Sequence, residues 1–281
     1  MLAGIQPGDE VIMPSFTFVS TANAFVLRGG VPVFVDVHPD TLNIDESLIE
    51  AAVTAKTKAV IPVHYAGVPC RMDTIMEIAG RRGIWVIEDA AQALLSQYRD
   101  QCVGVHGQMI CLSFHETKNI ISGEGGALLI NDPGVIERAE IIREKGTNRS
   151  QYFRGQVDKY TWVDVGSSYL PSDILAAFLY AQMENAEQII AKRNLIFDQY
   201  MEGLRPLADT GRIRLPLVIE DSRCNGHLFY IVTQSLKERT ELISFLAQRG
   251  IYAVFHYVPL HTSPAGRRFG RIHGSLKVTE A

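Results

Sequence analysis

The chain has 281 residues, of which 47% are hydrophobic and 21% are charged, and its net charge of -4 results from 27 basic and 31 acidic side chains. This composition excludes a disordered protein and indicates one sizeable domain plus part of another. The charges form no long run of either sign, so nothing indicates a nucleic-acid face.

Short β-branched runs alternate with helical patterns along the first half of the chain. The sequence predicts strands at residues 31–37, 59–64, 84–88, 109–114 and 127–131, several of them apolar throughout, as in strands that are covered on both faces. Helical spacing occurs at residues 45–53 and 73–82, and Gly83 can end the second helix in a left-handed conformation. This alternation indicates an α/β fold with a mainly parallel sheet.

The second half begins with a long helical pattern. It starts at Ser172, a plausible N-cap, and continues to about Leu204. Residues 228–233, 240–248 and 251–257 then have strand, helix and strand patterns. We therefore expect a large domain at residues 1–170, a linking helix at residues 171–204, and a small α/β domain at residues 205–281 that is cut short.

Three side chains of different chemistry follow the ends of two predicted strands. Asp89 ends the first run, Ser113 ends the next, and Lys118 comes five residues later. Ligands of open α/β sheets bind beyond the carboxyl ends of the strands, where these residues fall. A lysine amine can hold the aldehyde of pyridoxal phosphate (PLP) as a Schiff base, a carboxylate can keep the pyridine nitrogen protonated, and a hydroxyl can bind the phosphate.

The order of these residues therefore suits a PLP site. Because the lysine must be unprotonated to attack an aldehyde, we expect Lys118 to lie in a partly desolvated cleft. Taken singly, each residue has a simpler interpretation. Lys118 could be a solvated loop residue, and Asp89 could cap the next helix.

The chain also carries three longer motifs, Glu88-Asp-Ala-Ala-Gln92, Ser113-Phe-His-Glu-Thr-Lys118 and Gly123-Glu-Gly-Gly126. Together they resemble the DegT/DnrJ/StrS-type sugar nucleotide aminotransferases, a PLP family with the aspartate aminotransferase fold. Residues 14–23, 62–67 and 143–162 are similar to one branch, which forms dTDP-4-amino-4,6-dideoxygalactose for enterobacterial common antigen. The resemblance extends along essentially the whole chain.

The resemblance implies roles for the residues that match the family motifs. Lys118 would be the Schiff-base lysine, Asp89 the partner of the pyridine nitrogen, Gln92 a neighbour of the ring hydroxyl, and Ser113 a phosphate ligand. Phe18 matches an aromatic residue that stacks on the cofactor ring, although a phenylalanine in an apolar stretch can equally be a core residue.

The chain departs from the family pattern in three respects. Many members carry, at the position of Ser168, an asparagine that reaches the phosphate of the neighbouring subunit. Relatives also have, before residues 5–10, a loop whose helix start binds the cofactor phosphate, and they continue beyond Ala281. We therefore expect this chain to be a fragment.

Two groups of residues are candidates for substrate binding. His256 and His261 lie on one loop whose family position suggests contact with the nucleotide sugar, although a lone histidine is more often structural. Arg149 and Arg154 lie in a polar segment and could bind a pyrophosphate, although a solvated loop is the default for arginines.

The expected function is transfer of an amino group from L-glutamate to the 4-keto carbon of a dTDP-4-keto-6-deoxyhexose, by a homodimer with shared active sites. Sugar dehydratases of the family lack the Schiff-base lysine, whereas Lys118 is present here. A second alternative is an inactive chain with an assembly role or none.

We also expect a cytoplasmic protein without a metal site. The four cysteines form no CxxC pair, and no histidine spacing is that of a metal site. No apolar run is long enough to cross a bilayer, and the first residues do not have the pattern of a signal peptide.

Overall fold

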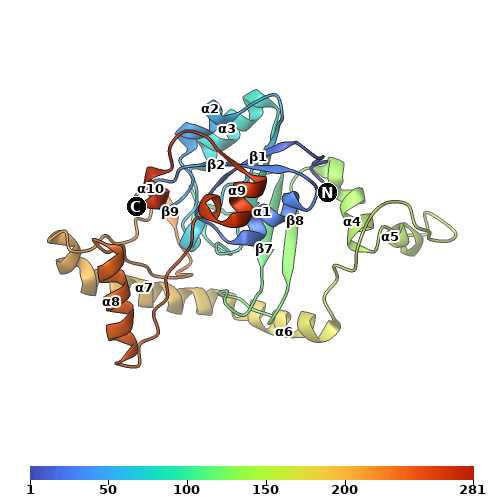
Figure 1. The fold of residues 1–281 in the computed structure, drawn as a ribbon. Coiled ribbons are helices and arrows are strands. Elements are labelled where there is room, and N and C mark those ends of the chain that lie inside the picture. The colour runs from blue at the N-terminus through green and yellow to red at the C-terminus, as the bar shows by residue number, and fades with distance from the viewer.

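A computed structural model describes residues 1–281 and is built around a seven-stranded sheet with the strand order β10-β2-β1-β3-β4-β7-β8 (Figure 1). All neighbouring strands are parallel except β7 and β8. The strands are β1 (Glu10–Pro14), β2 (Val31–Val35), β3 (Thr57–Val60), β4 (Trp85–Asp89), β7 (Met109–Ser113), β8 (Gly126–Ile130) and β10 (Arg271–Ile272). A second, three-stranded sheet contains β5 (Gln97–Tyr98), β6 (Gln101–Cys102) and β9 (Ser222–Arg223). The predicted α/β fold with a mainly parallel sheet is confirmed.

The helices are distributed along the whole chain. They are α1 (Val19–Val26), α2 (Ile49–Ala52), α3 (Met72–Arg82), α4 (Ile136–Arg143), α5 (Arg149–Phe153), α6 (Asp173–Glu184), α7 (Ala186–Asp209), α8 (Leu236–Ala247), α9 (Pro264–Phe269) and α10 (Lys277–Glu280), with the short 3-10 helices η1 (Glu46–Leu48), η2 (Tyr65–Gly67), η3 (Pro133–Val135) and η4 (Leu260–Thr262). Gly83 ends α3 in the left-handed conformation that the sequence predicts, with φ +64°. None of the helices combines the length and the hydrophobicity needed to cross a membrane.

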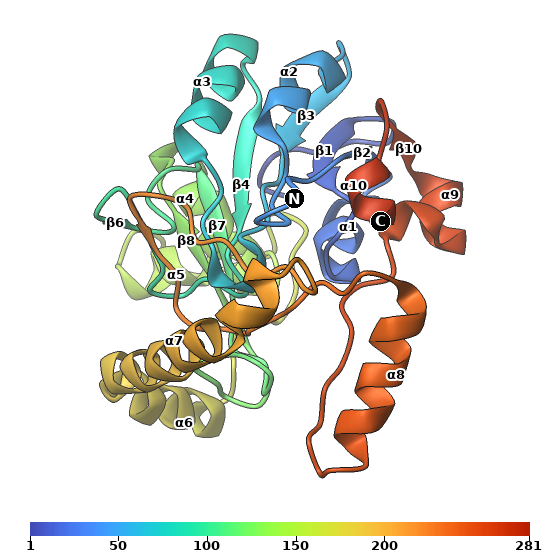
Figure 2. The same ribbon diagram turned by 90° about the vertical axis from the view of Figure 1, so that its left-hand side faces the viewer.

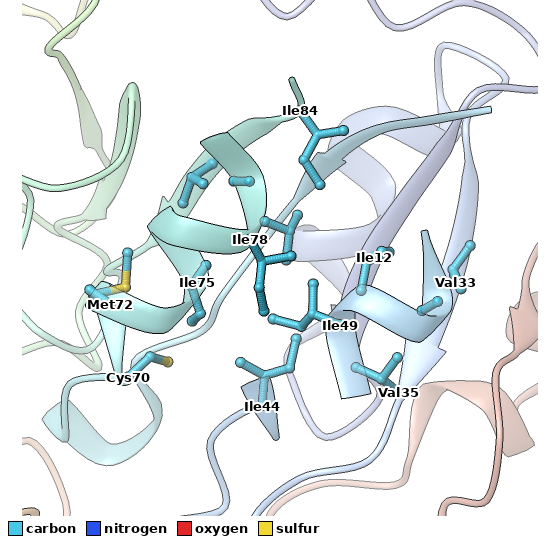
Figure 3. Close-up of a cluster of buried hydrophobic side chains, with 14 of the residues drawn as sticks. Ile12, Val33, Val35, Ile44, Ile49, Cys70, Met72, Ile75, Ile78 and Ile84 are labelled. Atoms are coloured by element: carbon cyan, nitrogen blue, oxygen red, sulfur yellow. The ribbon is translucent and has the colours of Figure 1, made fainter. Parts of the chain in front are cut away.

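The apolar strands β1 and β2 near the centre of the sheet are buried on both faces. On one face, Ile12 of β1 and Val33 of β2 pack with residues of α2 and α3, such as Ile49 and Ile75 (Figure 3). On the other face, alternate residues of the same strands, including Val11, Met13 and Phe34, pack with α1 and with residues 260 and 276. Burying one such side chain contributes about 1.5–3 kcal/mol. Burial on both faces explains the continuous apolar runs in the sequence.

Two strands of this sheet are absent from the sequence-based prediction. β1 lies near the centre of the sheet, between β2 and β3, and its last residue is Pro14. β10 has only two residues, and its pairing with β2 places Arg271 opposite Val33. Because β10 comes from the C-terminal part of the chain, local sequence patterns do not reveal that it completes the sheet edge.

The prediction of one continuous helix from Ser172 to about Leu204 is wrong, because the helix is interrupted at Asn185. Ser172 does cap α6, since its side-chain oxygen accepts from the backbone N-H of Leu175. At Asn185 the backbone leaves the helical region, and the side-chain amide donates to the carbonyl of Ala181 at 2.9 Å. Asparagine side chains compete in this way with the helical hydrogen-bond ladder. α6 and α7 are therefore separate helices.

The predicted strands at residues 228–233 and 251–257 are also wrong. Both segments lack a strand ladder, and their one pairing is an isolated bridge between Arg214 and Val232. A strand requires a neighbour that pairs with successive backbone groups, and the pairing here is limited to that one bridge. The predicted helix at residues 240–248 is present as α8, which projects away from the main sheet (Figure 2). The division into domains at residues 170 and 204 remains a prediction.

Candidate active site

The ends of β4 and β7 bring the predicted cofactor residues to one edge of the sheet. The two strands are parallel neighbours, with Asp89 opposite Cys111, so Asp89 and Ser113 both lie at their carboxyl ends. The loop that follows β7 carries Lys118. Ser113, Lys118 and Gln92 line one small pocket with about 180 Å³ of empty space, part of it open to solvent.

Lys118 has the environment expected of a reactive amine. Burial lowers the pKa of its ammonium group, and the nearby negative charge of Asp89 partly opposes this effect. The backbone N-H of Lys118 donates to the carbonyl of His115 at 2.9 Å, which closes a tight turn after β7. This environment favours the neutral amine more than water does, as reaction with an aldehyde requires.

The carboxylate of Asp89 is held by one donor on each oxygen. The hydroxyl of Thr21 donates to Oδ2 at 2.7 Å, and the backbone N-H of Ala91 donates to Oδ1 at 3.1 Å. Turns follow β4, so Asp89 caps a turn and no helix begins there. The interpretation of Asp89 as a helix cap is therefore not supported.

The side chain of Gln92 is fixed on both sides. Its Oε1 accepts from the backbone N-H of Ala66 at 2.7 Å, and its Nε2 donates to the hydroxyl of Tyr257 at 3.1 Å. Phe18 immediately precedes α1 and is 57% exposed, with its ring centroid 6.5 Å from that of Tyr257. Phe18 is therefore an accessible aromatic residue beside this group, and it does not have the burial of a core residue.

The two histidines of the predicted substrate loop have different surroundings. His256 stacks on Tyr257 with 4.5 Å between ring centroids, and burial, aided by the charge of Lys118, lowers its pKa. His261 is an internal residue, because its Nδ1 bonds the hydroxyl of Ser15 at 2.7 Å and its Nε2 bonds Glu280 at 3.1 Å. The prediction that His261 contacts the substrate does not fit this placement.

The structure does not bring the other predicted residues to this pocket. Arg154 on the segment after α5 bonds Glu140, and Arg149 lies 3.6 Å from Glu144. Ser168 forms an isolated bridge with Glu144. These residues belong to the part of the chain around α4 and α5 that projects to the right in Figure 1.

A polar network beside Lys118 is absent from the sequence-based prediction. Asn119 donates to the carbonyl of Asn225 at 2.8 Å, and its side-chain oxygen is 3.0 Å from Nδ1 of His227. The amide of Asn225 donates to the carbonyls of Gln92 and Leu94, both at 2.9 Å. Burial, aided by the charge of Lys118, lowers the pKa of His227 to about 3, so its ring is neutral. Residues 225–227 thus connect the loop after β4, which carries Gln92, with the loop after β7, which carries Asn119.

Gly226 allows this network to form. Its φ is +59°, and a Cβ atom added there would lie 2.8 Å from a backbone carbon of Arg193 on α7. The short sequence Asn225-Gly-His is the only local signal of the network, since Asn-Gly predicts a turn. Its partners lie more than a hundred residues away, so the sequence does not identify them.

A buried hydrogen bond between His64 and Glu88 stabilises the end of β4 behind the pocket. His64 and Glu88 are both fully buried and 2.9 Å apart. Nδ1 of His64 accepts from the backbone N-H of Cys70, so its Nε2 carries the proton and donates to Glu88. Burial alone would raise the pKa of Glu88, but this hydrogen bond and the donor from Gly107 lower it. The end of the strand that carries Asp89 is therefore firmly held.

These residues fit PLP chemically. The pocket offers an amine with a lowered pKa at Lys118, a hydroxyl at Ser113 and an oriented amide at Gln92. Asp89 presents an anionic carboxylate near the amine, and Phe18 presents an accessible ring beside them. This is the set of groups that a pyridine ring bearing an aldehyde, a hydroxyl and a phosphate requires.

Comparisons with known proteins agree with this fold and chemistry. The chain resembles the solved structure of DesV from S. venezuelae with a TM-score of 0.87 and 35% identity, covering 99% of this chain and 73% of that one. It resembles the PLP form of the putative sugar aminotransferase Spr1654 from Streptococcus pneumoniae with a TM-score of 0.85 and 28% identity, covering 99% and 73% of the two chains. The fold is thus that of PLP-dependent aminotransferases.

The chain belongs to the DegT/DnrJ/EryC1/StrS aminotransferase family, which matches residues 1–281. It is 34% identical over 268 residues to the spore coat polysaccharide biosynthesis protein SpsC of Bacillus subtilis (strain 168), covering 93% of this chain and 68% of that protein. The predicted family and its PLP cofactor are confirmed. The protein is therefore a PLP-dependent sugar aminotransferase.

Proposed function

We propose that this protein transfers the amino group of L-glutamate to the 4-keto carbon of a dTDP-4-keto-6-deoxyhexose, with formation of a dTDP-4-amino-4,6-dideoxygalactose. The main support is the single pocket that Lys118 shares with Ser113 and Gln92, within the electrostatic reach of Asp89. The similarity of residues 14–23, 62–67 and 143–162 to one branch of the family supports this particular sugar. We also propose a cytoplasmic location.

PLP, when bound, supplies an electron sink that stabilises negative charge on a carbon that loses a proton. With PLP bound, Asp89 would partner the pyridine nitrogen and would keep it protonated through its own negative charge. Lys118 would hold a proton at its Nζ and move it, as a positioned amine does in general acid-base catalysis. Ser113 would bind the phosphate, Gln92 would orient the ring hydroxyl, and Phe18 would cover one ring face.

We propose that His256 contacts the nucleotide sugar, because it lies beside Lys118 and stacks on Tyr257. We further propose that a second copy of the chain completes the active site. The segment around α5 and α6 exposes many large apolar side chains, among them Trp162 at 76% and Ile174 at 82%. Large exposed apolar side chains that recur along one segment are typical of protein interfaces. Arg149, Arg154 and Ser168 would then act at the neighbouring site.

Spectral titration tests the proposed activity. Purified protein titrated with PLP should develop the absorbance band of a lysine-bound cofactor, and L-glutamate should convert it to the pyridoxamine spectrum. Lys118→Ala should abolish the band and lower activity by about 10³-fold or more, because the variant lacks both the attachment point and the acid-base group. Lys237→Ala is the matched control, since this lysine is exposed on α8.

The substrate is tested by incubating the glutamate-treated protein with the dTDP-4-keto sugar and analysing the product by mass spectrometry and NMR. An amino group at C4 with the galacto configuration supports the proposal. A colourless wild-type protein that is unaffected by PLP would instead support the alternative of an inactive chain. Cofactor binding without transfer to the dTDP sugar would contradict only the substrate assignment.

A further inference from the structure

Two buried hydroxyls connect the start of α1 to the end of β4. Thr17 and Thr21 are almost fully buried, and their Oγ1 atoms are 3.0 Å apart. Oγ1 of Thr21 also lies 2.7 Å from Oδ2 of Asp89. An ionised carboxylate can only accept, so the hydroxyl proton of Thr21 points to Asp89 and Thr17 donates to Thr21. The two hydrogen bonds therefore run in one direction, from Thr17 to Thr21 and from Thr21 to the carboxylate of Asp89.

The conformation of Thr21 is unusual for a threonine in a helix. Threonine hydroxyls within helices commonly bond the carbonyl four residues earlier, as Thr240 of α8 does with Leu236 at 2.8 Å. The hydroxyl of Thr21 instead crosses to the sheet, where its bond to a charged acceptor is short and strong. Together with the N-H of Ala91 on Oδ1, this bond fixes the plane of the Asp89 carboxylate.

The same turn of chain also places Phe18. The backbone N-H of Thr21 donates to the carbonyl of Phe18 at 3.2 Å. This hydrogen bond fixes the position of the Phe18 backbone relative to that of Thr21. Residues three apart in a helical turn lie on neighbouring positions of one face. One short segment thus positions both the exposed ring of Phe18 and the donor to Asp89.

We propose that Thr21 is a positioning residue that orients the Asp89 carboxylate toward the pyridine nitrogen of PLP, in register with the ring of Phe18. This inference rests on the proposed function, in which Asp89 is the partner of that nitrogen. Loss of the hydroxyl leaves Oδ2 without its donor and allows the carboxylate to rotate. Hydrogen bonds to charged groups are strong enough for such a loss to weaken cofactor binding by roughly 10-fold.

The test compares Thr21→Val, which keeps the shape but removes the hydroxyl, with Thr21→Ser, which keeps the hydroxyl. The readouts are the dissociation constant of PLP and the midpoint of the pH titration of the bound-cofactor absorbance. Thr21→Val should bind PLP roughly 10-fold more weakly and should shift this midpoint, and Thr21→Ser should restore both toward wild type. Thr240→Val on α8 controls for loss of a threonine hydroxyl that bonds only a backbone carbonyl.

If Thr21→Val does not fold, as judged by circular dichroism, Thr21→Ala replaces it and the comparison with Thr21→Ser again isolates the hydroxyl. Wild-type affinity and an unchanged titration midpoint in the variant without the hydroxyl would overturn the inference. Equal weakening in the variants with and without the hydroxyl would also overturn it. A wild-type protein that binds no PLP would reject the proposed function itself, which distinguishes the two failures.

Discussion

Two opposing influences act on the amine of Lys118. Burial disfavours its ammonium form and is the larger influence, whereas the negative charge of Asp89 favours that form. The net effect is a lowered pKa, so a larger fraction of the amine is neutral near pH 7 than for a lysine in water. The same carboxylate that is proposed to serve the pyridine nitrogen therefore also limits how far this pKa falls.

Replacement of Asp89 by Asn should lower the pKa of Lys118 further, because burial then acts without the opposing charge. The measurement is the pH dependence of chemical labelling of Lys118 in cofactor-free protein, followed by mass spectrometry. Labelling of the exposed Lys237 in the same samples serves as an internal reference. A pKa of Lys118 that rises in Asp89→Asn would contradict this account of the site.

At the scale of elements, an ion pair connects two strands from opposite ends of the chain. Arg271 of β10 donates two hydrogen bonds, each 2.8 Å long, to the carboxylate of Glu10 on β1. The hydrogen bond from Arg271 is the main cause of the lowered pKa of Glu10. β2 lies between these two strands, so the pair spans three strands at the sheet edge.

Replacing Arg271 by Gln should lower the free energy of unfolding by about 1 kcal/mol at neutral pH, a modest value because the arginine is partly exposed. A lowered pKa in the folded state stabilises the protein above the ordinary pKa of the group, 4.5, and this contribution disappears as the pH falls through the folded-state value. Urea unfolding of both proteins should therefore show a difference at pH 7 that shrinks in acid. A difference that grows as the pH falls below 4.5 would refute the assignment.

At the scale of the whole molecule, apolar surface is unevenly distributed. The centre of the sheet is covered on both faces, yet the segment from α5 to α6 exposes Phe153, Trp162, Tyr169 and Ile174, each at 60% or more. A monomer in water rarely leaves such a group uncovered. The proposed second copy would cover it and would bring the α5 region to a neighbouring pocket.

Ile174→Glu should weaken self-association by at least 10-fold, because burial of an unpaired charge in an apolar interface costs more than about 1.4 kcal/mol. Light scattering coupled to size-exclusion chromatography over a range of concentrations measures this change. Tyr252→Glu is the matched control, since Tyr252 is 91% exposed on the segment after α8, away from α6. A wild-type protein that remains monomeric at all concentrations would disprove the second copy.

Local patterns in the sequence were sufficient for the strands around the pocket and for the residues that follow them. Asp89 and Ser113 could be identified because buried parallel strands are continuous apolar runs and because ligand sites follow their carboxyl ends. Gly83 and Ser172 were identified as helix ends because capping depends on the residues of a single turn. The family motifs then connected these positions with PLP.

The sequence by itself determined the α/β class, because that depends on neighbours along the chain, and its family motifs indicated the cofactor and predicted Lys118 as the reactive lysine. Only the tertiary structure decided which distant groups surround them. Three hydrogen bonds show this: Thr21 donates to Asp89, Asn225 donates to the carbonyl of Gln92, and Ser15 bonds the ring of His261. Each joins residues 68 or more positions apart. Side-chain hydrogen bonds over such separations depend on how the elements pack, and no local pattern of apolar and polar residues encodes them.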